Sequence, residues 1–270
     1  MNFGDGDMLE HNWDYEDQVD RELFQVEKDI PYCPPGAEGH ADRMRTLWLS
    51  TPRRARGFAT VVWFHGGGLA SDLHEHPDTL YSGDTAVAEV RYRVSPQVKA
   101  PAYMEDAAAA VAWVLGNIAG RGGDPGRVVV GGMSAGAYLA ALVTMDKTWL
   151  APHNFSHHDI KGLALVSGQM SVHFQVKADL GYPGDRYLPV VDKLAPLAHL
   201  AADLPPMLLV CGDPACDIPA RAEENAYMAA SLKALGHPDV RYHSLAGHCH
   251  GGTLRSSGYL FEKFLKDIAP

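Results

Sequence analysis

Short apolar runs alternate with longer segments of helical periodicity along the chain. The apolar runs are continuous rather than interrupted by polar residues, which is typical of strands covered on both faces. These runs lie at residues 59–64, 86–92, 127–130, 162–166 and 207–211, and a further strand candidate spans 240–245. Apolar spacings of three and four, with end signals such as Pro219 and Gly236, predict helices. The predicted helices span residues 105–118, 135–145, 219–235 and 253–268. Together these elements predict an α/β fold with a mostly parallel sheet of about eight strands and helices on both faces.

The chain shows no sign of a division into separate domains. It contains no internal repeat, low-complexity tract or Gly/Ser linker, so residues 1–270 are expected to form one α/β domain. Residues 1–30 are acidic with scattered aromatic side chains. We expect an arm or short helix there that could act as a lid, and an edge strand. Residues 168–204, between the predicted sixth and seventh strands, offer the only room for a cap. That segment is short, so an open pocket is expected.

Composition narrows the function classes. The apolar share of 46% allows a sizeable core. The formal charge of −10, without any run of Lys or Arg, argues against nucleic acid and anionic membranes as partners and mildly disfavours strongly anionic substrates. Asp5 and Asp7 stand where a signal peptide would need basic and apolar residues, and no apolar run reaches transmembrane length. Four cysteines without CxxC spacing favour a reducing setting. We therefore expect a cytoplasmic protein, and a homodimer is compatible with the sequence.

The clearest chemical signal is the motif GMSAG at residues 132–136, directly after a predicted strand and before a predicted helix. A sharp strand-to-helix turn exposes the serine hydroxyl, and only glycine fits two positions to either side, where strand and helix crowd together. The helix N-terminus also favours negative charge developing at that hydroxyl. Ser134 is therefore the candidate nucleophile. The alternative is a glycine-rich turn whose serine only caps the helix.

A second signal, HGGG at residues 65–68, follows the strand predicted at 59–64. Successive glycines let the backbone pass close to a substrate and turn its N–H groups inward. Each donor aimed at a forming oxyanion contributes about 3 kcal/mol of transition-state stabilisation. We expect His65 to support this loop rather than to transfer protons. The alternative is a flexible turn without a chemical role.

These two motifs, with YRVSP at 92–96 and GGDP at 122–125, resemble the hormone-sensitive-lipase-like esterases and their kynurenine-formamidase-like relatives. The resemblance implies the α/β-hydrolase fold, in which the catalytic residues follow the chain order Ser, Asp or Glu, then His. It also implies oxyanion donors at the second and third glycines of HGGG and at the residue after the nucleophile. In this chain those positions are Gly67, Gly68 and Ala135.

A serine nucleophile needs an imidazole to take its proton. The segment GHCHGG at 247–252 follows the last predicted strand, where the resembling family has a His-Gly pair. We therefore favour His250 as the base and keep His248 as the alternative.

The acid that orients the base is expected in the loop at 212–219. Asp213 begins a sequence that imitates the DPLxDE of the lipase-like branch, but two later positions depart from it. Asp217 lies just before the helix predicted to start at Pro219, where a strand-to-helix loop reaches the carboxyl edge of the sheet. We favour Asp217 and expect Asp213 to brace the loop backbone.

Cys216 and Cys249 flank the candidate acid and base, so they are expected to lie close together. Zinc held by these cysteines with His248 and His250 is an alternative, but a histidine that binds a metal is not free to act as a base. We therefore expect two buried, unpaired thiols and neither a metal nor a cofactor.

The motifs together predict a serine carboxylesterase that hydrolyses small esters through a Ser134–His250–Asp217 triad and an acyl-enzyme. Short acyl chains are favoured because the segment 168–204 offers little apolar wall. Two alternatives stay open: an arylformamidase-type amide hydrolase, and a non-catalytic, ligand-binding homologue.

Overall fold

Eight strands form one sheet in the computed structural model, which describes residues 19–34, 43–74, 78–81 and 83–270. Their order across the sheet is β1-β2-β4-β3-β5-β6-β7-β8. β2 runs antiparallel to its neighbours β1 and β4, and the remaining pairs are parallel. The predicted mostly parallel sheet is thereby confirmed. The strands are β1 Phe24–Pro31, β2 Thr46–Pro52, β3 Phe58–Phe64, β4 Ala86–Val90, β5 Gly123–Met133, β6 Gly162–Val166, β7 Met207–Cys211 and β8 Val240–Ser244.

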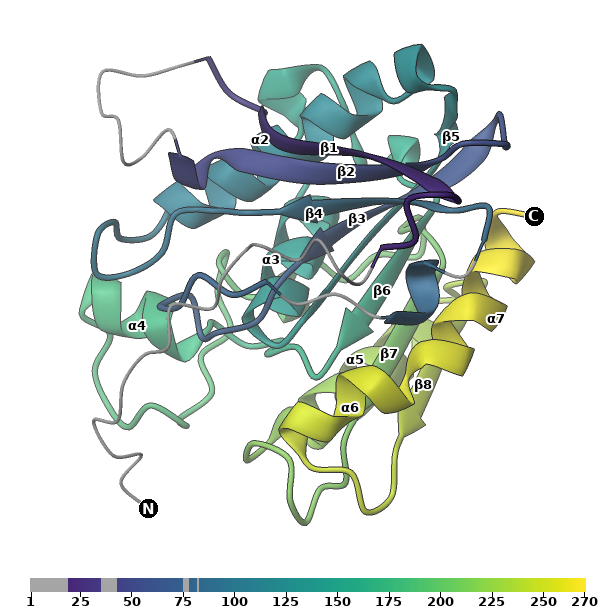
Figure 1. Cartoon of the computed structure of the whole chain (residues 1–270). Helices are drawn as coiled ribbons and strands as arrows, with labels where there is room; N and C mark the ends of the chain where they lie inside the picture. Colours follow the sequence, from purple (N-terminus) through teal and green to yellow (C-terminus); the bar gives the residue numbers. More distant parts are fainter. Residues whose placement is uncertain (1–18, 35–42, 75–77, 82) are drawn as a thin grey trace.

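Helices cover both faces of the sheet (Figure 1). α2, α3 and α5 pack on one face, and α6 and α7, yellow in Figure 1, pack on the other, where Phe261 and Phe264 are fully buried. Every residue of β3 and of α3 is buried, because these elements lie in the middle layer of the fold. The helices are α2 Ala102–Asn117, α3 Ala135–Met145, α4 Phe174–Leu180, α5 Arg221–Ala234, α6 His250–Ser256 and α7 Gly258–Ile268.

The sheet begins with an antiparallel pair that the apolar pattern only half predicts. β1 is the edge strand expected in the opening segment. β2 is fully buried, but its short sequence TLWLSTP has only three consecutive apolar residues, flanked by Thr and Ser. The predicted arm at 1–30 lies mostly outside the described residues, which begin at residue 19.

Two predicted helices differ from the observed ones. The helix expected from Pro219 begins at Arg221, because Ala220 adopts a left-handed conformation with φ 67°. The helix expected over 253–268 is two helices, α6 and α7, that meet at Ser257, whose Oγ donates a 2.6 Å hydrogen bond to the Leu254 carbonyl.

The six parallel strands bring their carboxyl-end loops to one edge of the sheet. Phe64 pairs with Gly132 and Met133 with Val166, so β3, β5 and β6 end side by side. β7 and β8 continue the same direction. Ligands of open α/β sheets bind at this carboxyl edge. The connection between β6 and β7, which contains α4, also starts here. Within the described ranges, no helix has the length and apolar character needed to cross a bilayer.

Candidate active site

Ser134 stands at the sharp turn between β5 and α3. Its backbone has φ 54° and ψ −113°, a strained conformation for a residue with a side chain. The flanking glycines are required because a Cβ at Gly132 would lie 2.5 Å from the Gly136 carbonyl carbon, and one at Gly136 would collide with the Phe64 carbonyl. The turn leaves the Ser134 side chain at the N-terminus of α3, with the residue only 8% exposed.

A chain of two hydrogen bonds joins Ser134 to His250 and Asp217. His250 Nε2 lies 2.9 Å from Ser134 Oγ, and His250 Nδ1 lies 2.6 Å from Asp217 Oδ1. The carboxylate accepts from Nδ1–H, which leaves the lone pair of Nε2 to accept the serine proton. The structure therefore brings the three predicted residues together, and their catalytic roles stay predictions.

Asp217 is held rigidly at the end of the β7 loop. Its side chain is 1% exposed, and besides His250 it accepts hydrogen bonds from Ser167 Oγ, Gly212 N and Ile218 N. Burial raises the pKa of Asp217, but the hydrogen bonds from His250 and the backbone amides outweigh it, so the pKa lies below its ordinary value. The carboxylate is thus kept charged beside the imidazole.

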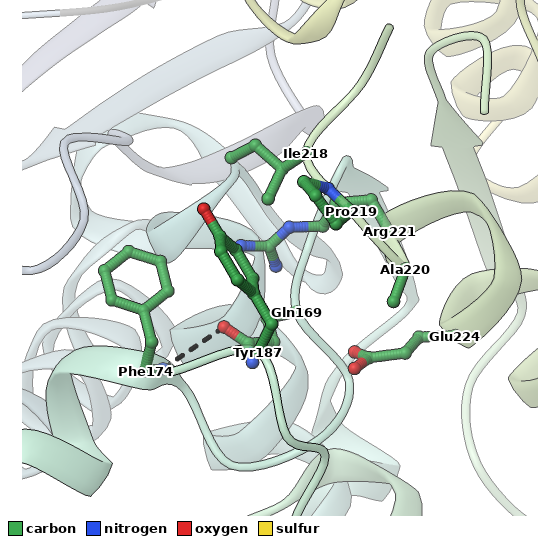
Figure 2. Close-up of a pocket in the computed structure, with 8 residues that line it drawn as sticks. All are labelled: Gln169, Phe174, Tyr187, Ile218, Pro219, Ala220, Arg221 and Glu224. Carbon is green, nitrogen blue, oxygen red and sulfur yellow. Dashed lines mark hydrogen bonds between the residues drawn. The ribbon is translucent and has the colours of Figure 1, made fainter. Parts of the chain in front are cut away.

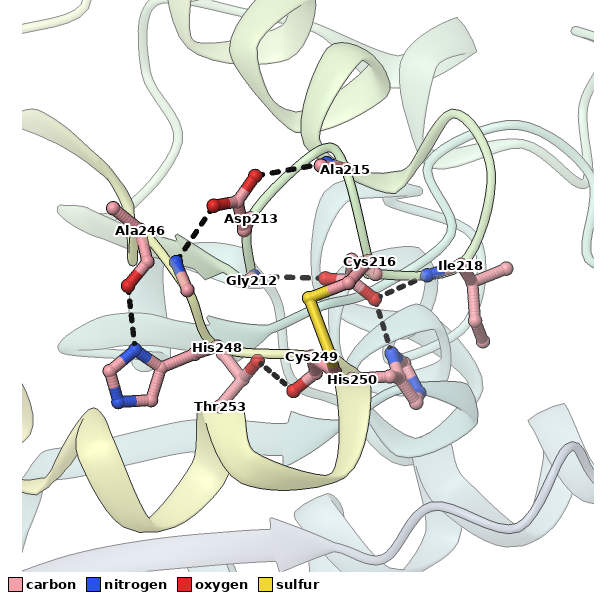
Figure 3. Close-up of a disulfide and its surroundings, with 12 residues drawn as sticks. Gly212, Asp213, Ala215, Cys216, Ile218, Ala246, His248, Cys249, His250 and Thr253 are labelled. Atoms are coloured by element: carbon pink, nitrogen blue, oxygen red, sulfur yellow. Dashed lines mark hydrogen bonds and ion pairs between the residues drawn. A yellow bond between two sulfur atoms is a disulfide. The ribbon is translucent and has the colours of Figure 1, made fainter.

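The two alternative residues, Asp213 and His248, lie apart from the imidazole of His250 (Figure 3). Asp213 accepts hydrogen bonds from Gly247 N at 2.7 Å and Ala215 N at 2.9 Å, which tie the β7 loop to the β8 loop. These backbone donors hold the pKa of Asp213 below its usual range. His248 is exposed, and its Nδ1 lies 3.1 Å from the Ala246 carbonyl. Both side chains have bracing contacts and neither contacts Ser134.

The glycine loop after β3 supplies free amide donors near Ser134. Gly67 and Gly68 have φ of 93° and 67°, and neither amide donates a hydrogen bond to another residue that the structure describes. Ala135 is the first residue of α3, where an N–H has no acceptor within the helix. The three amides predicted as oxyanion donors are therefore available at the carboxyl edge of the sheet.

The buried side chain of His65 supports the glycine loop through contacts with Tyr92 and Gly66. Its ring is buried and stacks on Tyr92 with centroids 4.3 Å apart, and its Nδ1 lies 2.8 Å from the Gly66 carbonyl. The Tyr92 hydroxyl donates to the His65 carbonyl at 2.8 Å. Burial lowers the pKa of His65 to about 4, so the ring is neutral at physiological pH. These contacts agree with a supporting place for the ring.

The expectation of two buried, unpaired thiols is wrong. Cys216 and Cys249 form a disulfide, with Cα atoms 4.8 Å apart, and both residues are exposed (Figure 3). Their predicted proximity is correct, but the bond consumes both thiols, so neither sulfur is a thiolate for zinc. Disulfides persist in oxidising compartments. The cysteines therefore no longer support the expectation of a reducing setting. The disulfide joins the residue before Asp217 to the residue before His250.

Sequence reasoning missed a pocket beside Asp217. The pocket is small and partly open to solvent, and residues 218–221, directly after Asp217, form one wall (Figure 2). Phe174 and Tyr187, both from the segment expected to cap the site, form another. The Phe174 ring also lies 3.5 Å from the position of a Cβ on Gly68. The pocket therefore borders both the glycine loop and the loop of Asp217.

Comparison with known proteins agrees with this geometry. A family model described as alpha/beta hydrolase fold matches residues 61–254. Esterase LipQ of Mycobacterium tuberculosis is 28% identical over 249 residues, which are 85% of this chain and 58% of LipQ. The carboxylic ester hydrolase LipN of the same organism is 32% identical over 231 residues, 74% of this chain and 59% of LipN. The chain thus spans less than three fifths of the length of these two relatives.

A similar architecture occurs among solved structures. A truncated carbohydrate esterase from gut microbiota superposes with a TM-score of 0.74 over 93% of this chain and 99% of that chain. Its sequence identity is 14%, so the likeness concerns the fold alone. The family model, in contrast, covers most of the chain and includes the HGGG and GMSAG motifs. The chain therefore belongs to the alpha/beta hydrolase fold family.

Proposed function

We propose that this protein is a serine carboxylesterase that cleaves small esters through Ser134, His250 and Asp217. The observation that carries this proposal is the hydrogen-bonded chain from Ser134 Oγ through His250 to Asp217 at the carboxyl edge of the sheet. The relatives named esterase LipQ and carboxylic ester hydrolase LipN support the reaction class.

In the first half of the proposed reaction, Ser134 Oγ attacks the ester carbonyl carbon while His250 Nε2 takes its proton. A carbon–oxygen bond forms and the carbonyl oxygen becomes an oxyanion. The amides of Gly67, Gly68 and Ala135 stabilise that charge, at about 3 kcal/mol for each well-aimed donor. Asp217 fixes the tautomer of His250 and stabilises the imidazolium.

Collapse of this intermediate breaks the bond to the alcohol, which leaves with the proton from His250 Nε2. The acyl group stays on Ser134 as an ester. In the second half, His250 takes a proton from water, and the hydroxyl attacks the acyl-enzyme carbonyl. The carboxylic acid is released when the Ser134 oxygen recovers its proton, so no cofactor enters the balance.

The proposed cap favours short acyl groups. Residues 168–204 contain one short α-helix, α4, and one 3-10 turn, Pro196–His199, and the bordering pocket is small. Each buried CH₂ contributes about 0.8 kcal/mol only where an apolar wall is present.

Steady-state kinetics of a Ser134→Ala variant test the function. With 4-nitrophenyl acetate and butyrate as substrates, the rate should fall by several orders of magnitude, because the nucleophile is absent. Ser231→Ala, on α5, is the matched control and should retain wild-type turnover. Retention of more than about a tenth of the activity in Ser134→Ala would contradict the proposal. Faster cleavage of an N-formyl arylamine than of either ester would move the function to amide hydrolysis.

A further inference from the structure

Arg221 is a buried cation whose hydrogen-bonding capacity is unused. The residue is 2% exposed, and its Nε and Nη1 atoms are buried without a partner. No hydrogen bond or ion pair joins the guanidinium to any residue within the described ranges. Figure 2 shows the side chain extending from the start of α5 across the pocket toward Tyr187. A buried charged group left unpaired is costly, so a site that keeps one calls for an explanation.

The acidic groups near Arg221 do not supply the missing hydrogen bonds. Glu224 accepts from Met170 N, Ser171 N and Ser171 Oγ, and Asp217 is occupied by four donors. Burial lowers the pKa of Arg221, and the charges of Glu224 and Asp217 only oppose that shift through space. The N–H groups of Arg221 are thus available to an acceptor that enters the pocket.

Other positive charges gather on the same side. The Arg186 guanidinium lies 4.3 Å above the Phe174 ring, which lines the pocket. The buried Lys177 donates its Nζ hydrogens to the carbonyls of Asp185 and Leu188. Burial, followed by the charges of Arg221, Arg186 and Lys177, lowers the pKa of the neighbouring His173 well below its usual value. Arg221 also opens α5, where the helix dipole adds positive potential.

We propose that this pocket binds a carboxylate on the substrate, with Arg221 as its paired cation. A guanidinium offers two parallel N–H groups that match a carboxylate, and such charge-assisted pairs are strong in a water-poor site. The preferred substrates are then esters that also carry a free carboxylate, either half-esters of short dicarboxylic acids or esters of hydroxy acids. This local preference runs against the net charge of −10, which disfavours anions only at long range. The inference rests on the proposed esterase function.

Two matched ester pairs test the inference and locate the carboxylate. In the first pair, kcat/KM for monoethyl glutarate is compared with that for its neutral amide, ethyl glutaramate. This pair tests a carboxylate on the acyl side. 4-Acetoxybenzoate against 4-acetoxybenzamide places it on the alcohol side, with both rates normalised to alkaline hydrolysis. In at least one pair the wild-type kcat/KM should favour the carboxylate by about tenfold or more. A preference for the neutral ester in both pairs overturns the inference, and it would point to a neutral acceptor such as a carbonyl.

Variants assign the preference to Arg221. Arg221→Met should lower the charged-to-neutral kcat/KM ratio on the order of 10- to 100-fold, and Arg221→Lys should restore part of it because the charge remains. Lys233→Met removes an exposed charge from the other end of α5 and should leave the ratio unchanged. The Tm of Arg221→Met should not fall, because an unpaired buried charge is removed.

The outcomes distinguish a failure of this inference from a failure of the proposed esterase function. If Arg221→Met loses the fold, or slows both esters of a pair equally, Arg221 is structural and the inference fails. If no neutral ester is cleaved in a Ser134-dependent manner, the proposed function itself fails. Ser134-dependent cleavage without any carboxylate preference overturns only the role of Arg221.

Discussion

Replacement of Asp217 by Asn separates the two aspartates of the β7 loop. Each oxygen of the Asp217 carboxylate accepts two hydrogen bonds, Oδ1 from His250 and Ile218, and Oδ2 from Ser167 and Gly212. An asparagine has a single oxygen, so in either orientation its NH₂ group faces two of these donors. The substitution preserves shape but breaks the pairing.

The magnitude follows from which donors lose their acceptor. If the amide NH₂ faces His250, the imidazole must place its proton on Nε2, which then cannot take the proton of Ser134. Loss of the correct tautomer costs a factor on the order of 10⁴ in kcat. If the NH₂ faces Ser167 and Gly212, the hydroxyl can rotate to accept but the backbone amide cannot. One buried donor without an acceptor costs about 1–3 kcal/mol of unfolding free energy, so the variant should also be less stable.

The assay combines kcat for 4-nitrophenyl butyrate with urea unfolding of the same preparations. Asp213→Asn is the matched control, because its carboxylate accepts only from Gly247 and Ala215 and lies apart from His250. That variant should retain most of the wild-type kcat. The reverse ranking of the two variants would refute the assignment of Asp217 as the acid.

Three further predictions concern stability and substrate size. Thiol titration of the denatured, unreduced protein should detect only Cys33 and Cys211. Replacing Cys216 and Cys249 by Ser should lower the unfolding free energy by about 3 kcal/mol and reduce kcat; four titratable thiols in the wild type would contradict the disulfide. Because burial lowers the pKa of His65 to about 4, against about 6.5 in the unfolded chain, the unfolded state binds the proton first as pH falls. Stability present above pH 6.5 should therefore decrease by about 2 kcal/mol between pH 7.5 and 5, and by less in His65→Asn; equal losses in urea unfolding would contradict this cause. Finally, kcat/KM for 4-nitrophenyl esters should fall beyond butyryl, and a steady rise to octanoyl would show a larger acyl site.

The sequence predicts the elements whose apolar pattern is continuous. β6 and β7 lie where the runs at 162–166 and 207–211 place them, because both faces of these strands are covered. The sharp turn at Ser134 is predictable because the close approach of strand and helix leaves no room for a side chain at Gly132 and Gly136. The sequence does not predict β2, because the burial of this strand comes from its neighbouring strands and not from its own composition.

Features that depend on tertiary contacts could not be predicted. The positions of Cys216 and Cys249 beside the candidate acid and base predict that they lie close together, but only the loop geometry shows that they form a disulfide. The preference for Asp217 from sequence depends partly on a helix start at Pro219, yet α5 begins two residues later. The sequence gives Arg221 as an ordinary first-turn residue, and only the fold buries it at a pocket that Phe174 and Tyr187 also line.

The most direct test of the proposed esterase is covalent trapping of its nucleophile. The protein is incubated with a fluorophosphonate, and the labelled peptide is identified by mass spectrometry in the wild type, Ser134→Ala and His250→Ala. The account predicts one phosphonyl group per chain on Ser134, none on Ser134→Ala, and much slower labelling of His250→Ala because the hydroxyl is no longer activated. Labelling of another residue, or equal rates with and without His250, would contradict it.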